Sequence, residues 1–168
     1  MSIRSELAER LTDCLRGVSR LLKRAHQATL AEQEALVRND VQALMQCCKA
    51  QDEILRRIGE SDQVAAQIAT QLAKIAGVDP ETADAVVAAR AAGEPYGEAI
   101  LAEVREISES ARKVREESEI NRKLVDNGLD VVTSCLRTLA SDPTPNAYSN
   151  EAALTGPSSG VLAVDKRA

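Results

Sequence analysis

Residues 97–140, GEAILAEVREISESARKVREESEINRKLVDNGLDVVTSCLRTLA, decide the fold that this sequence predicts. Apolar or small side chains recur there at alternating spacings of three and four residues, which keeps them on one stripe of a long helix. Such a helix would be roughly 60 Å long, and it needs partners to cover its stripe in water. The stripe consists of Ile100, Val104, Ile107, Ala111, Val114, Ser118, Asn121, Val125, Gly128, Val132, Cys135 and Leu139.

Two polar residues, Ser118 and Asn121, interrupt this stripe near its middle. One interpretation is a tolerated polar layer that fixes the register of the packed helices. The other is that the helix changes its role here, so that its first half packs inside a bundle and its second half presents a wider apolar surface to a partner. The side chains that widen the second half are Leu124, Leu129, Val131 and Leu136.

The composition favours helices and excludes several functional classes. The chain of 168 residues has no Phe and no Trp, so its core must consist of aliphatic side chains, which suits packed helices. A net charge of −5 offers no broad basic face for nucleic acid. No apolar run is long enough to cross a membrane, and residues 1–11 lack the apolar core of a signal peptide. We therefore expect a cytoplasmic protein with no membrane insertion.

The sequence contains no recognisable catalytic or metal-binding motif. Its one histidine, His26, has no second ligand at a helical spacing, and the glycine loops and nucleophile motifs of enzymes do not occur. The four cysteines fit no zinc or redox spacing. We therefore expect no metal, no cofactor and no enzymatic activity, with free thiols in a reducing compartment. The cysteines are Cys14, Cys47, Cys48 and Cys135.

Two further long helices are predicted in the first half of the chain. The first should span residues 5–38 and the second residues 40–76, because apolar stripes at helical spacing run through both. Asn39 and Asp40 suit helix caps, so the two helices should lie antiparallel across a short turn. Gly59 leaves two alternatives, one helix that is possibly kinked or two shorter helices. The stripe assigned to the second helix includes Val41, Leu44, Met45, Cys48, Gln51, Leu55, Ile58, Ala65, Ile68, Leu72 and Ile75.

A short helix should connect the second and third long helices. Gly77 suits a helix C-cap, and Asp79 followed by Pro80 suits the start of an alanine-rich helix over residues 80–92. The apolar side of this helix is weak, and the pattern leaves its role open. That side consists of Ala85, Val86 and Ala89.

The character of the sequence changes after Ala140. Prolines and glycines at positions 143, 145, 156, 157 and 160 remove any helical period. The segment is either a disordered terminus or a segment that becomes ordered on a partner. The sequence thus predicts an all-α fold: an antiparallel bundle of three long helices with coiled-coil-like packing, a short helix between the second and third, and a flexible C-terminal tail. The bundle domain would span residues 1–140 and the tail residues 141–168.

Several stretches, taken in order, resemble the FlgN-type flagellar export chaperones. A long helix ends in LVRND (36–40), and the next begins VQALMQCCKAQDEIL (41–55). The third long helix contains SEINRKLVDNGLDVVTSCLRTLA (118–140), and the tail contains NAYSNEAALTG (146–156) before a short basic end, DKRA. The resemblance covers the whole chain, and its most specific part is the third long helix followed by a tail with a single tyrosine.

This resemblance implies a cytoplasmic, non-enzymatic chaperone of flagellar type III secretion. Such a protein binds the C-terminal helices of hook-associated (hook–filament junction) proteins, prevents their premature assembly and delivers them to the export gate. Tyr148 would contact the cytoplasmic domain of the export gate, or it would instead anchor the tail on the bundle. By position, the resemblance assigns client binding to Leu124, Leu129, Val131, Leu136, Leu139, Leu154 and Leu162.

Two other functional classes stay open at this point. A self-associating coiled-coil scaffold would close the stripe of the third long helix with a second copy, and a weak homodimer is compatible with the chaperone as well. A helical enzyme is the third class, and the missing acid–base and metal-binding residues disfavour it.

Overall fold

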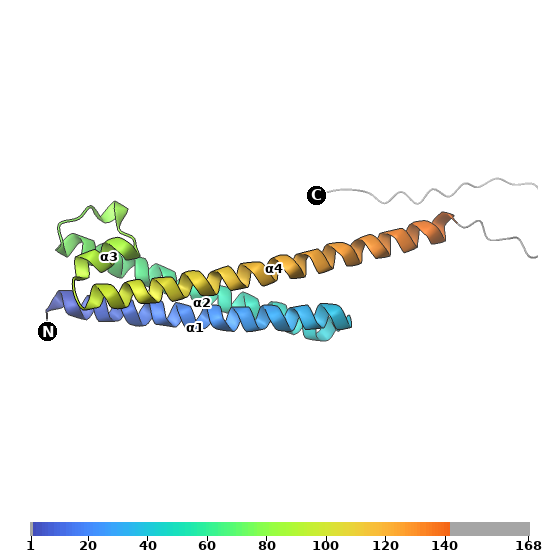
Figure 1. The fold of residues 1–168 in the computed structure, drawn as a ribbon, viewed down its shortest axis with the longest axis horizontal. Coiled ribbons are helices and arrows are strands. Elements are labelled where there is room, and N and C mark those ends of the chain that lie inside the picture. Colours follow the sequence, from blue (N-terminus) through green and yellow to red (C-terminus); the bar gives the residue numbers. More distant parts are fainter. Residues whose placement is uncertain (1, 142–168) are drawn as a thin grey trace, which may run out of the picture. The chain divides into compact units, whose positions relative to one another are not determined.

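The computed structural model describes residues 2–141, which form four α-helices and one short 3₁₀ helix (Figure 1). No strand occurs among these residues, and long helices pack together, which confirms the predicted all-α bundle. In chain order the elements are α1 (Ile3–Arg38), α2 (Val41–Ile75), the 3₁₀ helix η1 (Pro80–Thr82), α3 (Ala85–Ala92) and α4 (Tyr96–Ser141).

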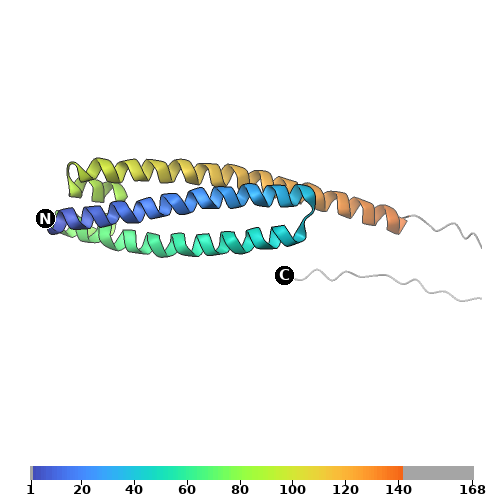
Figure 2. The ribbon, with the colours of Figure 1, turned by 90° about the horizontal axis from the view of Figure 1, so that it is seen from below.

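The chain divides into two units, residues 1–132 and residues 133–168. In the first unit α1, α2 and α4 run side by side, with α3 at one end (Figures 1 and 2). The described part of the second unit is the last stretch of α4, residues 133–141. The expected tail lies outside the described residues, so its flexibility and the domain boundary at residue 140 stay predictions.

Helices α1 and α2 are joined by two residues, as Asn39 and Asp40 predicted. Asn39 adopts the left-handed conformation (φ 53°), and its N–H donates to the carbonyl of Leu36 at 3.2 Å. The N–H of Asp40 donates to the carbonyl of Ala35 at 2.9 Å, which completes the end of α1. The Asp40 carboxylate accepts a hydrogen bond from the backbone N–H of Ala43 at 2.9 Å. Asp40 therefore closes α1 with its backbone and caps α2 with its side chain.

Helix α2 is continuous, so the structure has one helix through Gly59 rather than two. It ends where the sequence predicted, because Gly77 follows it with φ 71°. The N–H of Gly77 donates to the carbonyl of Lys74 at 3.2 Å, and that of Val78 donates to Ala73 at 2.9 Å. This pair of bonds is the Schellman arrangement, which satisfies the last carbonyls of a helix.

The predicted helix over residues 80–92 is wrong in its first half. Asp79 caps only the 3₁₀ turn η1, where its carboxylate accepts from the N–H of Glu81 at 3.0 Å. Ala83 is extended, and α3 begins anew with Asp84 as its N-cap, whose carboxylate accepts from Val87 at 2.7 Å. Two aspartates that both favour capping positions therefore split the segment into two short elements.

Helix α3 packs more closely than its sequence suggested. Its small side chains let the backbone approach its neighbours, and they join one buried cluster with Leu11, Leu72 and Ile100. At the start of α4, a Cβ on Gly97 would lie 2.7 Å from the carbonyl oxygen of Ala89. The expected apolar side is partly wrong, since Val86 is exposed while Ala89 is buried. The buried residues of α3 are Ala88, Ala89, Ala91 and Ala92.

The first half of α4 follows the predicted stripe. Ile100, Ile107 and Val114 recur every seven residues and pack into the two hydrophobic clusters of the bundle. Ser118 departs from the prediction because it is exposed, while Glu117 is half-buried in its place.

Candidate functional site

Helix α4 changes character at Asn121. Buried or half-buried residues recur up to Leu124, whereas every residue from Val125 to Ala140 is exposed. Within the first unit, the predicted stripe is therefore left uncovered from Val125 to Val132. The exposed apolar side chains of this half are Val125, Leu129, Val131, Val132, Leu136 and Leu139.

The structure places four of the predicted client-binding residues on solvent-facing parts of α4. Leu129 and Val131 belong to the first unit and are 60% and 63% exposed. Leu136 and Leu139 belong to the second unit and are exposed as well. A fifth, Leu124, is only half-buried. The remaining predicted residues, Leu154, Leu162 and Tyr148, lie outside the described residues.

A buried polar cluster marks the point at which α4 changes character. Asn121 is 4% exposed, and its amide nitrogen Nδ2 donates to the carbonyl of Thr29 at 2.9 Å and to Oε2 of Glu32 at 3.0 Å. The same Glu32 oxygen accepts from Nε2 of Gln51 at 2.8 Å. The cluster therefore joins α1, α2 and α4. The other amide atom of Asn121, Oδ1, is buried and has no hydrogen-bond partner among the described residues.

Two shallow grooves follow α4 near this cluster, one on each side. The groove between α2 and α4 has a volume of about 350 Å³, and the groove between α1 and α4 has about 440 Å³. Residues of the α2–α4 groove are Glu32, Gln51, Ser118, Asn121, Arg122, Val125 and Asp126. Residues of the α1–α4 groove are Gln33, Glu34, Val37, Arg38, Ile120 and Leu124.

Sequence reasoning missed an exposed apolar face on α2. Val41, Met45 and Leu55 were assigned to the core-facing stripe, but each is more than half exposed. The assignment was too wide, because Ile54 and Ile58 already face the neighbouring helices in this part of α2. Spacing offered a signal: Val41 and Leu55 share one face of α2, which differs from the face that holds Ile54.

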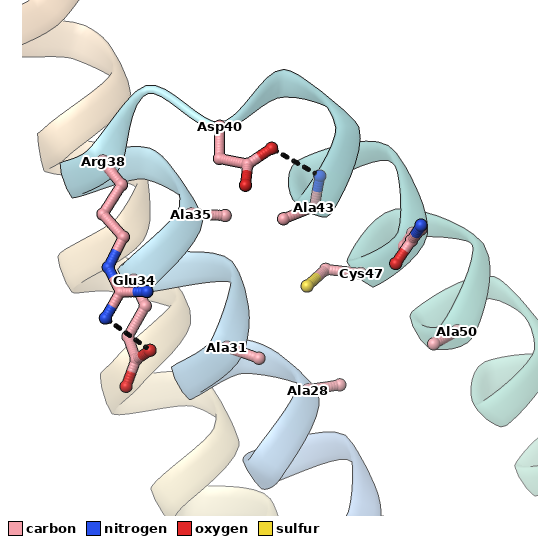
Figure 3. A pocket seen from close by; sticks show the side chains of 10 residues that line it. Ala28, Ala31, Glu34, Ala35, Arg38, Asp40, Ala43, Cys47 and Ala50 are labelled. Carbon is pink, nitrogen blue, oxygen red and sulfur yellow. Dashed lines mark hydrogen bonds and ion pairs between the residues drawn. The ribbon is translucent and has the colours of Figure 1, made fainter.

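A third pocket, of about 390 Å³, lies between α1 and α2 beside their turn (Figure 3). Alanines form half of its wall, and three of its polar residues already have partners. Glu34 pairs with Arg38 at 3.6 Å, and Asp40 is bound to the N–H of Ala43. Cys47 also lines it, and burial raises the pKa of this thiol, which disfavours the reactive thiolate. The pocket therefore offers no activated group for catalysis.

Ion pairs on the surface connect α1 with α4. Arg16 and Lys23 of α1 bind Glu103 and Glu106 of α4, at 3.1 Å in both pairs. Within residues 2–141, no group of three His, Cys, Asp or Glu side chains could hold a metal ion. None of the helices in the same range is both long and apolar enough to span a membrane. The candidate site is therefore a contact surface on α4.

The chain matches the FlgN family, described as FlgN protein, over residues 1–156. No curated protein and no solved structure matches it. The match spans the whole described bundle, including the exposed half of α4. The chain therefore belongs to the FlgN family, a family of flagellar export chaperones.

Proposed function

We propose that this protein binds the C-terminal helices of hook–filament junction proteins in the cytoplasm, prevents their premature assembly and delivers them to the export gate. The single observation that carries the proposal is the exposed apolar half of α4, between Val125 and Leu139, in a member of a chaperone family. A surface of this kind is unfavourable in water and favours a partner that covers it.

The chemistry of the surface fits an amphipathic helix as client. Val125, Leu129 and Val132 recur at spacings of four and three residues within the first unit, so they lie on one face of α4. A second helix can cover such a face with its own apolar stripe, which is the helix-in-groove mode of recognition. The client uses its apolar stripe to assemble with other subunits. A chaperone that covers this stripe would therefore prevent assembly until it releases the client.

The segment after Ser141 is proposed to contribute in two ways. Leu154 and Leu162 would extend the contact with the client, and Tyr148 would dock the chaperone on the cytoplasmic domain of the export gate. Ordering a flexible segment on binding costs conformational entropy, which keeps the affinity moderate. Moderate affinity suits a chaperone that must release its client.

The direct test is co-purification of hook–filament junction proteins with the full chain. Leu136→Ala should weaken client binding while leaving the melting temperature nearly unchanged, because the side chain is 61% exposed. Tyr148→Ala should keep client binding and weaken binding to the export gate. Absence of any complex with these proteins would contradict the client assignment. If Tyr148→Ala does not change binding to the export gate, the docking role is contradicted. The alternative role of Tyr148 as an anchor of the tail on the bundle is then favoured.

The same surface also supports the scaffold alternative, because a second copy could cover α4. Light scattering of the free chain over a range of concentrations separates the two functions. A chaperone should be a monomer or a weak dimer that gives way to the client complex. A tight dimer that client does not dissociate would favour a self-associating scaffold.

A further inference from the structure

We infer that the client helix lies in the groove between α2 and α4. It would lie end to end with α3 and cover the part of α2 that α3 leaves exposed. The inference rests on the proposed function, because it names the place and the polar contact of the same client. It adds α2 to the binding surface and gives Asn121 a part in recognition.

Helix α3 shows what a helix in this layer covers. It packs against α2, lies beside the start of α4 and also contacts α1 (Figures 1 and 2). On α2, Ala69 is buried in the same cluster as Ala88 and Ala89 of α3. Residues spaced by seven share a face of a packed helix, so the face of Ala69 continues through the exposed Asp62 to Leu55, Cys48 and Val41. One end of this face is covered by α3, and the other end is apolar and exposed.

Helix α4 provides the second wall. Ser118, Arg122 and Val125 line the α2–α4 groove together with Gln51 of α2. Leu129 follows Val125 by four residues and therefore continues the same face. The polar cluster around Asn121 lies between α3 and the open part of the groove. In that open part, both walls carry exposed apolar side chains.

The direction and length of the groove follow from the same contacts. Helices α2 and α4 are antiparallel, because Ile58 packs near Val114 and Gln51 lies near Asn121. Continuing by the same steps brings Val41 near residue 131 of α4. The uncovered face of α2 from Leu55 to Val41 would be about 21 Å long, so it would hold about four turns of helix.

The floor of the groove calls for a hydrogen-bond donor on the client. Oδ1 of Asn121 is a buried acceptor without a partner, while Nδ2 is fixed by Thr29 and Glu32, which both accept. Glu32 also places a carboxylate in the groove wall. A client helix that carries one amide, hydroxyl or cationic side chain within its apolar stripe would satisfy this acceptor and fix its own register.

A client helix fits this groove better than a segment of the same chain. The sequence after Ser141 contains no stretch as long as about four turns without Pro or Gly, and both residues disfavour a helix interior. The longest such stretch lies between Pro145 and Gly156. A second copy of the chain is the other possible occupant, and the experiment separates it from the client.

Two neighbouring cysteines make the inference testable in the full chain. Cys48 shares the face of Val41 and Leu55, so it should lie in the groove, whereas Cys47 lines the pocket between α1 and α2. We would measure maleimide labelling of each cysteine separately by mass spectrometry, because Cys14 and Cys135 are present as well. The two variants are Cys47→Ala, which keeps Cys48, and Cys48→Ala, which keeps Cys47. A hook–filament junction protein at about ten times its Kd should slow labelling of Cys48 about tenfold by occupancy. Labelling of Cys47 should not change.

Equal protection of both cysteines, or of neither in a complex that forms, would overturn the inference and leave the proposed function intact. Absence of a complex would instead defeat the proposed function. Protection of Cys48 that rises with chaperone concentration alone would assign the groove to a second copy. Faster labelling of Cys48 in the free chain after Leu154→Gln and Leu162→Gln would show that the tail occupies the groove. Both last outcomes overturn the client assignment.

A matched pair of substitutions tests the α2 wall directly. Val41 and Val37 are 66% and 68% exposed and flank the same turn, but Val37 lines the groove on the α1 side of α4. Val41→Gln should weaken client binding about tenfold, because a buried Val contributes through its apolar area. Val37→Gln should leave it unchanged. The reverse order would place the client in the α1–α4 groove and overturn the inference.

The polar contact has its own double-substitution test. Replacing the client donor by Leu should weaken binding to the natural chain about tenfold, since Oδ1 of Asn121 then stays buried without a partner. The client variant with Leu should bind the Asn121→Leu chaperone about as tightly as the natural client binds the natural chaperone. Equal losses on both chaperone variants would show that no contact with Asn121 exists.

Discussion

The side chain of Asn121 reaches from α4 to the backbone of α1, where its amide donates to the carbonyl of Thr29 at 2.9 Å. The same amide nitrogen donates to Glu32. This contact is the last buried one along α4, and it ends the part of the helix that the bundle covers. It therefore separates the buried half of α4 from an exposed half, while the register role of Asn121 and the binding of a partner by the second half stay predictions.

Removing the Asn121 amide should destabilise the bundle. Asn121→Ala leaves the Thr29 carbonyl and the Glu32 carboxylate with fewer partners, so the free energy of unfolding should fall by about 1–3 kcal/mol. Asn121→Asp should be worse at pH 7, because it places a second carboxylate beside Glu32. Protonation relieves this repulsion, so the deficit of the aspartate variant should shrink toward pH 4. Urea denaturation at both pH values measures the difference, and a deficit independent of pH would contradict this account.

Two glycines should respond in opposite ways to alanine. A Cβ on Gly59 would meet no atom within 4 Å, whereas one on Gly97 would lie 2.7 Å from the carbonyl oxygen of Ala89. Gly59→Ala should stabilise the protein by about 0.5–1 kcal/mol, because alanine loses less backbone entropy in a helix. Gly97→Ala should cost about 1–3 kcal/mol, because α3 and α4 must move apart. Thermal unfolding of both variants checks the pair, and a stabilising Gly97→Ala would refute the close approach.

Leucines of the core and of the exposed half of α4 should have separable effects. Leu72 is 1% exposed, so Leu72→Ala should lower the free energy of unfolding by about 2–5 kcal/mol. Leu129→Ala should change stability by less than about 0.5 kcal/mol, because its side chain faces solvent. Denaturation and client-binding measurements on the same samples separate the roles. A large loss of stability in Leu129→Ala would show that the bundle covers this residue.

The thiol of Cys14 should make the bundle less stable in alkali. Its Sγ donates to the carbonyl of Ser61 at 3.2 Å, and burial raises the pKa of the thiol above its ordinary value. The folded state therefore favours the protonated form. The stabilisation that the protonated thiol gives the folded state is complete below the thiol's pKa in the unfolded chain, about 8.5. It is lost as the pH rises through the pKa in the folded chain. Cys14→Ala should show a shallower alkaline decline in melting temperature than Cys48→Ala, the exposed control. Identical declines would contradict the role of Cys14.

Most of the fold could be predicted because it depends on local signals. Asn39, Asp40 and Gly77 mark helix ends through backbone and capping preferences that need no tertiary information. The helix α3 could not be read in the same way. Alanine has little hydrophobic signal, and Ala88 and Ala89 become core residues only because neighbouring helices approach their backbone. The start of α3 at Asp84 depended on a competition between two capping aspartates that the sequence alone does not decide.

The exposed half of α4 was predictable in outline, because its apolar width exceeded one stripe. The exposed apolar face of α2 was missed although Val41 and Leu55 lie on a different face from Ile54, because their spacing also matches that of core residues. Periodicity shows which residues share a face, but it does not show whether another helix covers that face. Coverage depends on where α3 ends, which is a tertiary property.

The turn at Asp40 has a consequence for how the chain assembles during synthesis. Because one residue terminates α1 and initiates α2, the first two helices are specified entirely by residues that leave the ribosome before α4 does. Pairings between sequence neighbours close small loops, which is the condition for fast folding. The helical hairpin can therefore be in place as a template when Ile100, Ile107 and Val114 emerge, and α4 then needs only to dock.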